Sequence, residues 1–242
     1  MNFTLFLNSR GRPKQLLHLI ETYDYNAKYP ELIEMFIRCD EDDLPTIEAL
    51  KDLDKRGTFQ FKVIVGPRPY NLATTMNEMA LMGKGQYLFI LNDDSEMVTK
   101  DWDELVLIRI AEYKKLNNIK DDILYVSIPD NSVDKIRGLH YASFPIISRA
   151  AVQVMGFFLY ECFVGLGGDS AIHRVFDKID RVVMMDDVYI DHIYHNNFFS
   201  VMSPDLIAHE MRTNSNNNPV DPFAININQE VDKLQQAITE QL

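Results

Sequence analysis

The stretch GQYLFILNDD, residues 85–94, decides how the rest of the sequence is interpreted. Its apolar residues 87–91 follow a glycine and lead directly into an amide and two carboxylates, which predicts a short buried strand. Open α/β sheets bind ligands beyond the carboxyl ends of their strands, where Asp93 and Asp94 would lie. Two adjacent acids repel each other and a divalent cation would relieve that repulsion, although Asn-Asp-Asp is also good turn chemistry.

Strand-like and helix-like segments alternate on both sides of this stretch. Before it, the apolar pattern predicts strands over residues 3–7, 33–39 and 61–65, with helices after Pro13, near Ile47 and after a cap at Asn71. After it, we predict helices over residues 101–113 and 169–176, and strands over 123–128, 142–148 and 182–190. Such alternation implies parallel strands with helical crossovers, so we predict an α/β protein with a mixed, mostly parallel sheet flanked by helices.

Composition limits the classes of function that are open to the chain. Its 242 residues are 46% hydrophobic, enough for a substantial core, and no apolar run is long enough for a transmembrane segment. The formal net charge of -12 argues against a nucleic-acid partner but permits a small phosphorylated ligand. The N-terminus lacks signal-peptide features, and Cys39 and Cys162 have no disulfide or metal-ligand spacing. We therefore expect a cytoplasmic protein with both cysteines reduced in its core.

Several motifs together resemble the nucleotide-sugar-binding half of a GT-A glycosyltransferase, most closely glycosyltransferase family 2. The pattern of that family is an Asn-bearing helix, a small residue two before a glycine, an aromatic residue, an apolar run and then Asp-x-Asp. Here it is matched in order and spacing by Asn77, Gly83, Gly85, Tyr87 and Leu91, and then by residues 92–94. Asn92 replaces the first acid, which weakens any role of that position in ribose or metal contact.

The resemblance covers about residues 2–200 and implies a Rossmann-like GT-A fold. It implies one catalytic domain over residues 1–212, with a nucleotide-sugar half (1–97) and an acceptor half (98–212). Residues 213–242 would add a mobile loop and an amphipathic C-terminal helix, and the segment from about His209 to Pro222 would close over the donor. The implied partners are a nucleotide-sugar donor, expected to be a UDP-sugar, and a glycan or another hydroxyl-bearing acceptor.

The resemblance also assigns the metal site and the catalytic base. Asp94 would be the direct ligand of Mn²⁺ or Mg²⁺, and His192 and His195 resemble the late histidine pair that can complete such a site. The segment FVGLGGDS, residues 163–170, resembles the Gly-rich turn and Glu-Asp pair of the family, with Gly168 in place of the Glu. Asp169 would then be the base of an inverting reaction. The structural alternatives are unliganded histidines and a carboxylate that only caps its helix.

The donor would be held at the ends of the first two strands. Ser9, Arg10 and Arg12 lie in the first strand-to-helix turn and suit phosphate or base contacts. Asp40 ends the second strand, where the resemblance implies a contact with base or ribose. The rest of the predicted donor-binding set is Asn77, Asn92 and Asp93. The alternatives are solvated arginines and an exposed acidic loop around Asp40.

Two other classes of function stay open. A sugar-phosphate nucleotidylyltransferase shares the sheet architecture, but it would require a Gly-rich phosphate-binding loop after the first strand. The segment SRGRP at residues 9–13 has only one glycine. A non-catalytic nucleotide-sugar or carbohydrate-binding module is compatible with the substitutions at Asn92 and Gly168. Trp102 could stack on an acceptor sugar or anchor the helix that it begins.

Overall fold

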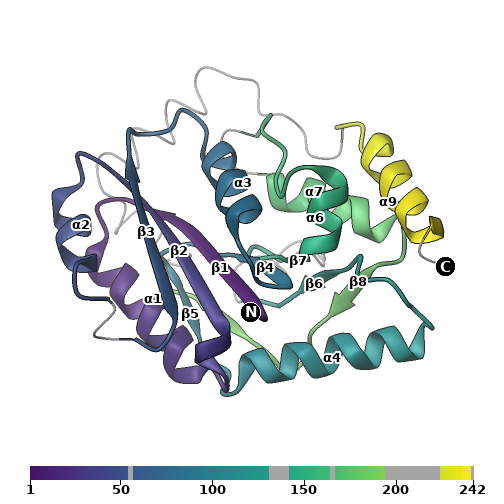
Figure 1. The fold of residues 1–242 in the computed structure, drawn as a ribbon, viewed down its shortest axis with the longest axis horizontal. Helices are drawn as coiled ribbons and strands as arrows, with labels where there is room; N and C mark the ends of the chain where they lie inside the picture. The colour runs from purple at the N-terminus through teal and green to yellow at the C-terminus, as the bar shows by residue number, and fades with distance from the viewer. Residues whose placement is uncertain (54–56, 131–141, 164–166, 194–223, 241–242) are drawn as a thin grey trace.

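The computed structural model describes residues 1–242 apart from 54–56, 131–141, 164–166, 194–223 and 241–242. The described residues form a seven-stranded sheet in the order β3-β2-β1-β4-β7-β6-β8 (Figure 1). Its strands are β1 (Phe3–Ser9), β2 (Ile33–Asp40), β3 (Gln60–Gly66), β4 (Tyr87–Ile90), β6 (Tyr125–Ser127), β7 (Ile146–Ser148) and β8 (Val182–Met184). Only β7 runs antiparallel to its neighbours, so the predicted mixed, mostly parallel sheet is confirmed.

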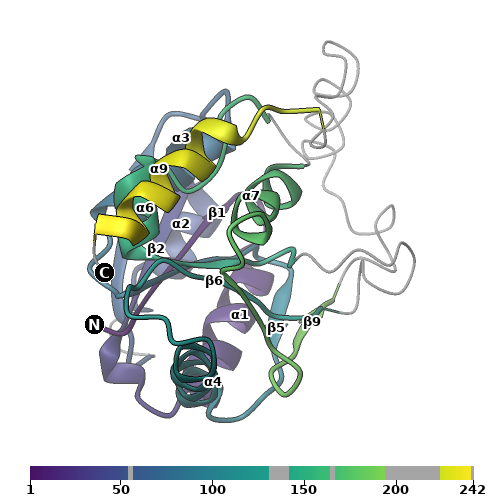
Figure 2. The same cartoon turned by 90° about the vertical axis from the view of Figure 1, so that its right-hand side faces the viewer.

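Helices cover both faces of this sheet, as Figure 2 shows from the side. One face packs on α1 (Pro13–Asn26), α2 (Leu44–Leu50) and α4 (Trp102–Leu116). The other packs on α3 (Leu72–Met82), α6 (Arg149–Met155), α7 (Gly168–Asp177) and α9 (Asn228–Glu240). Side chains alternate along a strand, so in β1 Leu5 joins the first core and Phe6 the second. Because β4 is buried on both faces, its sequence is a continuous apolar run without alternation.

The glycine before the apolar run is required by its surroundings. A Cβ atom on Gly85 would lie 2.3 Å from the carbonyl carbon of Phe3 and from the amide nitrogen of Thr4. The chain can therefore enter β4 beside β1 only where the residue has no side chain. The Gly85 N–H also donates to Thr4 Oγ1 at 2.8 Å, which ties the entry to β1.

The strands and helices after β4 differ from the sequence prediction in several places. The single strand predicted over residues 182–190 is two strands: β8, and β9 (Ile190–His192), which pairs antiparallel with β5 (Ser95–Met97) in a separate small sheet. Between them, the carboxylates of Asp186 and Asp187 lie 2.6 and 3.3 Å from Arg109 Nη2. This turn at the surface ends the first strand. Strand β5 and helix α6 were not predicted.

Three further expectations meet the structure here. The C-terminal helix is present as α9 and packs in the same core as α6 and α7. Cys39 is buried, but Cys162 is exposed, so the prediction that both are core residues is wrong for Cys162. The predicted loop from His209 to Pro222 lies outside the described residues. No helix in the described part of the chain is long and apolar enough to cross a membrane.

Candidate active site

Polar side chains from separate strand ends meet at the carboxyl edge of the sheet. Ser9 ends β1, while Asp93 and Asp94 follow β4, its parallel neighbour, so these residues open at the same edge. His192 ends β9, and the pairing of β9 with β5 places it opposite Ser95, the residue after Asp94. The small sheet β5–β9 therefore brings His192 beside Asp94, while its role as a metal ligand stays a prediction.

Asp93 is a buried carboxylate, and both of its oxygens accept hydrogen bonds from side chains of the protein. Its Oδ2 accepts a hydrogen bond from Ser9 Oγ at 2.8 Å, and its Oδ1 accepts one from Arg12 Nη1 at 2.9 Å. Burial raises the pKa of Asp93 to about 6, because the loss of solvent and the nearby charge of Asp94 outweigh the guanidinium of Arg12. Asp93 therefore holds the turn after β1 against the end of β4.

Asp94 has a different environment from its neighbour. Its Oδ2 lies 3.5 Å from Arg12 Nη1, and its Oδ1 lies 3.3 Å from His192 Nε2. Burial acts to raise the pKa of Asp94, but His192 and Arg12 outweigh it and the pKa is lowered. For His192 burial acts to lower the pKa, and the carboxylate of Asp94 reverses that effect and raises it. The pair therefore favours an ionised Asp94.

Asp94 and His192 fit two adjacent ligands of a divalent ion. Ligands at bond lengths of about 2.1 Å and right angles are roughly 3 Å apart, close to the 3.3 Å between Asp94 Oδ1 and His192 Nε2. Asp94 Oδ1 is buried and accepts no hydrogen bond from the residues described. Within those residues, however, no group of three or more His, Cys, Asp or Glu side chains could hold a metal. His195, the other predicted ligand, lies outside the described residues.

Asp40, at the end of β2, lies among arginines. Arg10 Nη1 donates to Asp40 Oδ2 at 3.0 Å, Arg38 Nη1 is 3.8 Å from Oδ1, and Arg68 Nε is 4.0 Å from Oδ2. Only 7% of Asp40 is exposed, so the exposed-loop alternative is wrong for this residue. Arg10 also contacts both carboxylate oxygens of Asp42. The turns after β1 and β2 are thereby joined, with partly exposed guanidinium groups at the sheet edge.

Asp169 lies in the first turn of α7. The N-cap residue is Gly167, in the left-handed region at φ 102°, so the predicted alternative of Asp169 as the N-cap is wrong. Its Oδ1 accepts a hydrogen bond from the Ser170 amide at 2.8 Å. Burial raises the pKa of Asp169 and Asp130 adds to the effect, although the Ser170 amide opposes it. The expectation that the helix N-terminus keeps this carboxylate ionised is therefore opposed by burial.

Asp130 is an acid that the sequence reasoning missed. Its charge acts to raise the pKa of Asp169 and also that of His192. A parallel bridge with Ile190 places it beside the strand that carries His192. The signal was present in the sequence, since Asp130 follows the predicted strand 123–128 as Asp93 follows residues 87–91.

The two asparagines of the predicted donor set are in contrasting positions. Asn92 is exposed at the sheet edge, and its carbonyl accepts hydrogen bonds from the amide and hydroxyl of Ser95 at 3.1 and 2.9 Å. Asn77 is 6% exposed, and its amide is hydrogen-bonded to the segment that follows α6. Contact of Asn92 with a donor stays a prediction. The Asn77 amide instead holds the backbone of the segment after α6.

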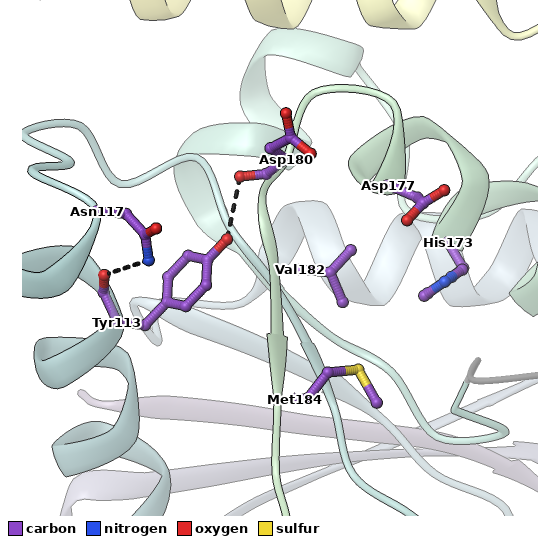
Figure 3. A pocket seen from close by; sticks show the side chains of 7 residues that line it. All are labelled: Tyr113, Asn117, His173, Asp177, Asp180, Val182 and Met184. Carbon is purple, nitrogen blue, oxygen red and sulfur yellow. Dashed lines mark hydrogen bonds between the residues drawn. The ribbon is translucent and has the colours of Figure 1, made fainter.

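A hollow of about 810 Å³ lies elsewhere, between α4, α7 and β8 (Figure 3). It is lined by Tyr113, Asn117, His173, Asp177, Asp180, Val182 and Met184. None of these residues belongs to the predicted site, and the Tyr113 hydroxyl donates across the hollow to the Asp180 carbonyl at 3.0 Å. The hollow is therefore separate from the carboxylates at the sheet edge.

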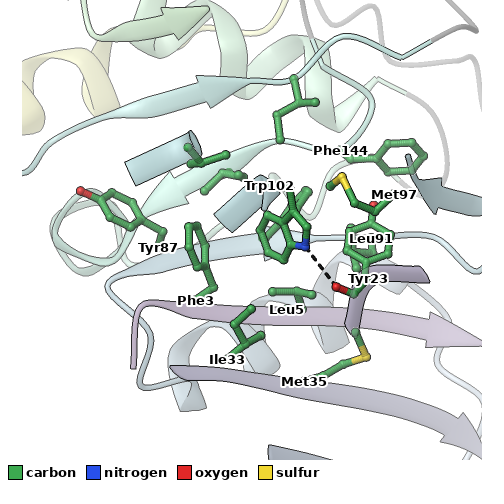
Figure 4. Packing of buried hydrophobic residues seen from close by; sticks show 14 of the residues in the cluster. Phe3, Leu5, Tyr23, Ile33, Met35, Tyr87, Leu91, Met97, Trp102 and Phe144 are labelled. Atoms are coloured by element: carbon green, nitrogen blue, oxygen red, sulfur yellow. Dashed lines mark hydrogen bonds between the residues drawn. The ribbon is translucent and has the colours of Figure 1, made fainter. Parts of the chain in front are cut away.

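Trp102 is part of the core rather than of the site. It is fully buried, and its indole Nε1 donates to the Tyr23 carbonyl at 3.1 Å (Figure 4). Its ring also contacts those of Phe3 and Phe89, with centroids 5.2 and 5.8 Å away. The alternative that Trp102 anchors its helix is confirmed, and stacking on an acceptor sugar is excluded.

No protein-family model matches the sequence, and no curated protein matches it. Several solved structures, however, are similar to this chain. The mannosyltransferase PcManGT from Pyrobaculum calidifontis, in complex with GDP-Man and Mn²⁺, aligns with a TM-score of 0.62 at 12% identity, over 100% of this chain and 72% of that one. S. aureus TarS 1–349 in complex with UDP aligns with a TM-score of 0.59 at 13% identity, over 88% of this chain and 64% of that one.

The longer form of S. aureus TarS aligns with a TM-score of 0.59 at 12% identity, and this chain spans 42% of it. The likeness at such low identity shows the fold. That fold is the GT-A arrangement that the sequence predicted.

Proposed function

We propose that this chain is a glycosyltransferase that moves a sugar from a nucleotide-sugar donor to an acceptor hydroxyl with inversion. One observation carries the proposal: two adjacent carboxylates, the buried Asp93 and the half-buried Asp94, lie at the carboxyl edge of a GT-A sheet. Arg12 lies near both of them and His192 lies near Asp94. The charges of two adjacent acids oppose each other, whereas a metal-bound diphosphate requires such a group of hard oxygen ligands.

The donor half of the site would bind and orient the nucleotide. Asp94 and His192 would hold Mn²⁺ or Mg²⁺, which would stabilise negative charge on the departing diphosphate. Arg12 stands beside these acids, and Arg10 stands beside Asp40 at the end of the neighbouring strand β2. Both guanidinium groups suit phosphate oxygens. Asp93 would keep Arg12 and the β1 turn in place, through its two hydrogen bonds.

The acceptor half would supply the base. Asp169 would take the proton of the acceptor hydroxyl while that oxygen bonds to the anomeric carbon and the bond to the diphosphate breaks. Burial raises the pKa of this carboxyl, and a more basic carboxylate accepts a proton more readily at neutral pH. The charge of Asp130 acts in the same direction.

The similar solved structures contain GDP-Man, UDP and UDP-GlcNAc, so whether the donor of this chain carries uracil or guanine has to be measured. We expect UDP to bind with Mn²⁺ or Mg²⁺ and not with chelator, because an anionic diphosphate is repelled by the acidic pair alone. Calorimetry with UDP and GDP in each condition tests this, and saturation at about a hundred times the Kd should stabilise the fold by about 2.7 kcal/mol.

The transfer itself is tested by product analysis with UDP- and GDP-sugars and a panel of sugar acceptors. Release of nucleoside diphosphate together with a new glycoside of inverted anomeric configuration is the expected result. Equal nucleotide binding with chelator would contradict the metal assignment. Tight metal-dependent binding without turnover of any donor would favour the non-catalytic module instead.

A further inference from the structure

One side chain, that of Asn77, makes several hydrogen bonds that tie the segment after α6 to the donor-binding half. Residues 157–163, here called the strap, pass over α3. Asn77 Oδ1 accepts hydrogen bonds from the amides of Phe158 and Leu159 at 2.9 and 2.8 Å. Asn77 Nδ2 donates to the Leu159 carbonyl at 2.9 Å and to Glu161 Oε1 at 3.3 Å. One amide group therefore satisfies three backbone groups of the strap.

These bonds use the full capacity of the Asn77 side chain. A primary amide has two N–H donors and one oxygen with two lone pairs, and described residues occupy all four positions. Asn77 is 6% exposed, so a nucleotide could reach it only if the strap were released. Direct donor binding, which the sequence predicted for Asn77, does not agree with this geometry.

The other side of the strap lies against the residue before the base. A Cβ atom on Gly168 would be 3.6 Å from Leu159 Cδ2 and 3.9 Å from Phe163 Cβ, so these side chains pack directly on Gly168. Leu159 thus contacts Asn77 through its backbone and Gly168 through its side chain. The contact is continuous from helix α3 to the first turn of α7, where Asp169 follows Gly168.

The strap is also anchored at its own sides. Phe158 is fully buried, and its ring meets that of Phe6 edge-on at a centroid distance of 5.0 Å. The Tyr160 hydroxyl donates to Glu230 Oε2 of α9 at 3.0 Å, and Glu230 is 7% exposed. With these anchors, the amide of Asn77 sets where the strap backbone lies relative to α3.

We infer that Asn77 is a positioning residue for transfer, which holds Leu159 and Gly168 so that Asp169 meets the acceptor hydroxyl in register with the bound donor. This role rests on the proposed function, because Asp169 must be the base. At its N-terminal end, α3 adds a second tie, since the side chain of its cap Asn71 donates to the Glu161 carbonyl. The donor-binding half and the base are therefore linked by one short, well-anchored segment.

The test compares Asn77→Ala with Ser148→Ala in the full chain. Ser148 Oγ accepts hydrogen bonds from the amides of Leu124 and Ala151 at 3.0 and 3.4 Å, so its loss removes buried bonds of the same kind elsewhere in the fold. In Asn77→Ala we expect turnover to fall by about 10²-fold, as for a reacting group displaced by about 1 Å, while the Kd for UDP stays at the wild-type value. Ser148→Ala should lower the melting temperature without changing turnover below it.

Two further measurements separate positioning from mere stability. Asn77→Asp keeps the bonds accepted from Phe158 and Leu159 but turns a carboxylate oxygen toward the Leu159 carbonyl and Glu161 Oε1, so it should not recover the turnover lost in Asn77→Ala. Amide hydrogen exchange should accelerate over residues 157–163 in Asn77→Ala and not in Ser148→Ala. Unchanged exchange in the strap would show that Asn77 does not hold it and would overturn the inference.

The outcomes also distinguish this inference from the proposed function. A wild-type protein that transfers sugar while Asn77→Ala matches its turnover would overturn the positioning role alone. A turnover loss that is matched by an equal rise in the Kd for UDP would return Asn77 to donor binding. A wild-type protein that transfers nothing from any donor would overturn the proposed function and this role with it.

Discussion

Two carboxylates at opposite edges of the sheet, Glu34 and Asp94, have contrasting surroundings. Glu34, at the amino edge, is 5% exposed, and its Oε1 accepts hydrogen bonds from Thr4 Oγ1 at 2.6 Å and from the Gly85 amide at 3.2 Å. Asp94, at the carboxyl edge, lies beside a second acid, and its buried Oδ1 accepts no hydrogen bond from the residues described. Neutral donors make the first acid part of the framework. The second acid faces two groups that carry or can gain a positive charge, Arg12 and His192, and we propose that it binds a metal ion.

The sharpest test of this contrast is Asp169→Asn, at the carboxyl edge. Asparagine can still accept the Ser170 amide bond but cannot take a proton, so we expect turnover to fall by about 10²–10⁴-fold with little change in melting temperature. In the wild type the base is active when ionised. Because its pKa is raised, turnover should decline as the pH falls toward that pKa, above the ordinary 3.8.

The pH profile of kcat, measured for the wild type and for Asp169→Asn, checks that prediction. The acid limb should be present in the wild type and absent from the residual turnover of the variant. A variant with near-normal turnover would remove Asp169 from the mechanism, and a product with retained configuration would remove the inverting scheme altogether.

Asp94→Asn should produce the next largest effect. The amide lacks the charge that favours a divalent ion, so we expect the Mn²⁺-dependent part of UDP binding to disappear and transfer to fall by about 10²–10³-fold. Calorimetry with Mn²⁺ and with chelator measures the binding. Asp101→Asn is a suitable control, since Asp101 precedes α4 and its side chain caps no amide there. Metal-dependent binding that survives in Asp94→Asn would place the ion elsewhere.

The raised pKa of Asp93 predicts that the free energy of unfolding depends on pH. Its pKa is about 6 in the folded protein against an ordinary 3.8, so the folded state holds the proton more tightly. The stabilisation by the protonated group is fully present below pH 3.8 and is lost as the pH rises through 6. The unfolding free energy of wild type minus that of Asp93→Asn should therefore fall by on the order of 1.4 kcal/mol per pH unit between these values.

Chemical denaturation of both proteins without metal, at several pH values from 4 to 7, measures this difference. Parallel pH profiles would mean that Arg12 and Ser9 offset the burial of Asp93, and that its pKa is not raised.

The smallest expected effect concerns the amino edge. Glu34→Ala would leave the Thr4 hydroxyl and the Gly85 amide without their acceptor, so we expect a loss of about 1–3 kcal/mol in unfolding free energy. Turnover well below the melting temperature should not change. Glu31→Ala, at an exposed position of the neighbouring turn, should change stability by less than about 0.5 kcal/mol. If fully folded Glu34→Ala lost transfer activity, Glu34 would not be a purely structural acid, and the contrast with Asp94 would be wrong.

The parts of the fold that were predicted correctly rest on local signals. The run 87–91, the cap at Asn71 and the proline at the start of α1 are each recognisable within a few residues, and each was found where predicted. The strand predicted over 182–190 was wrong because apolar residues continue on both sides of Asp186 and Asp187. Only the distant Arg109 shows that the chain turns there.

The sequence by itself determined the α/β class, the apolar run of β4 and the acids that follow it. These depend on the periodicity and conformational preferences of adjacent residues. Tertiary structure decided the partners: the buried state of Asp93, the approach of His192 to Asp94, the position of Asp130 and the attachment of Asn77 to the strap. A hydrogen bond or a pKa depends on groups that folding brings together from distant segments, and no local pattern records which segments those will be.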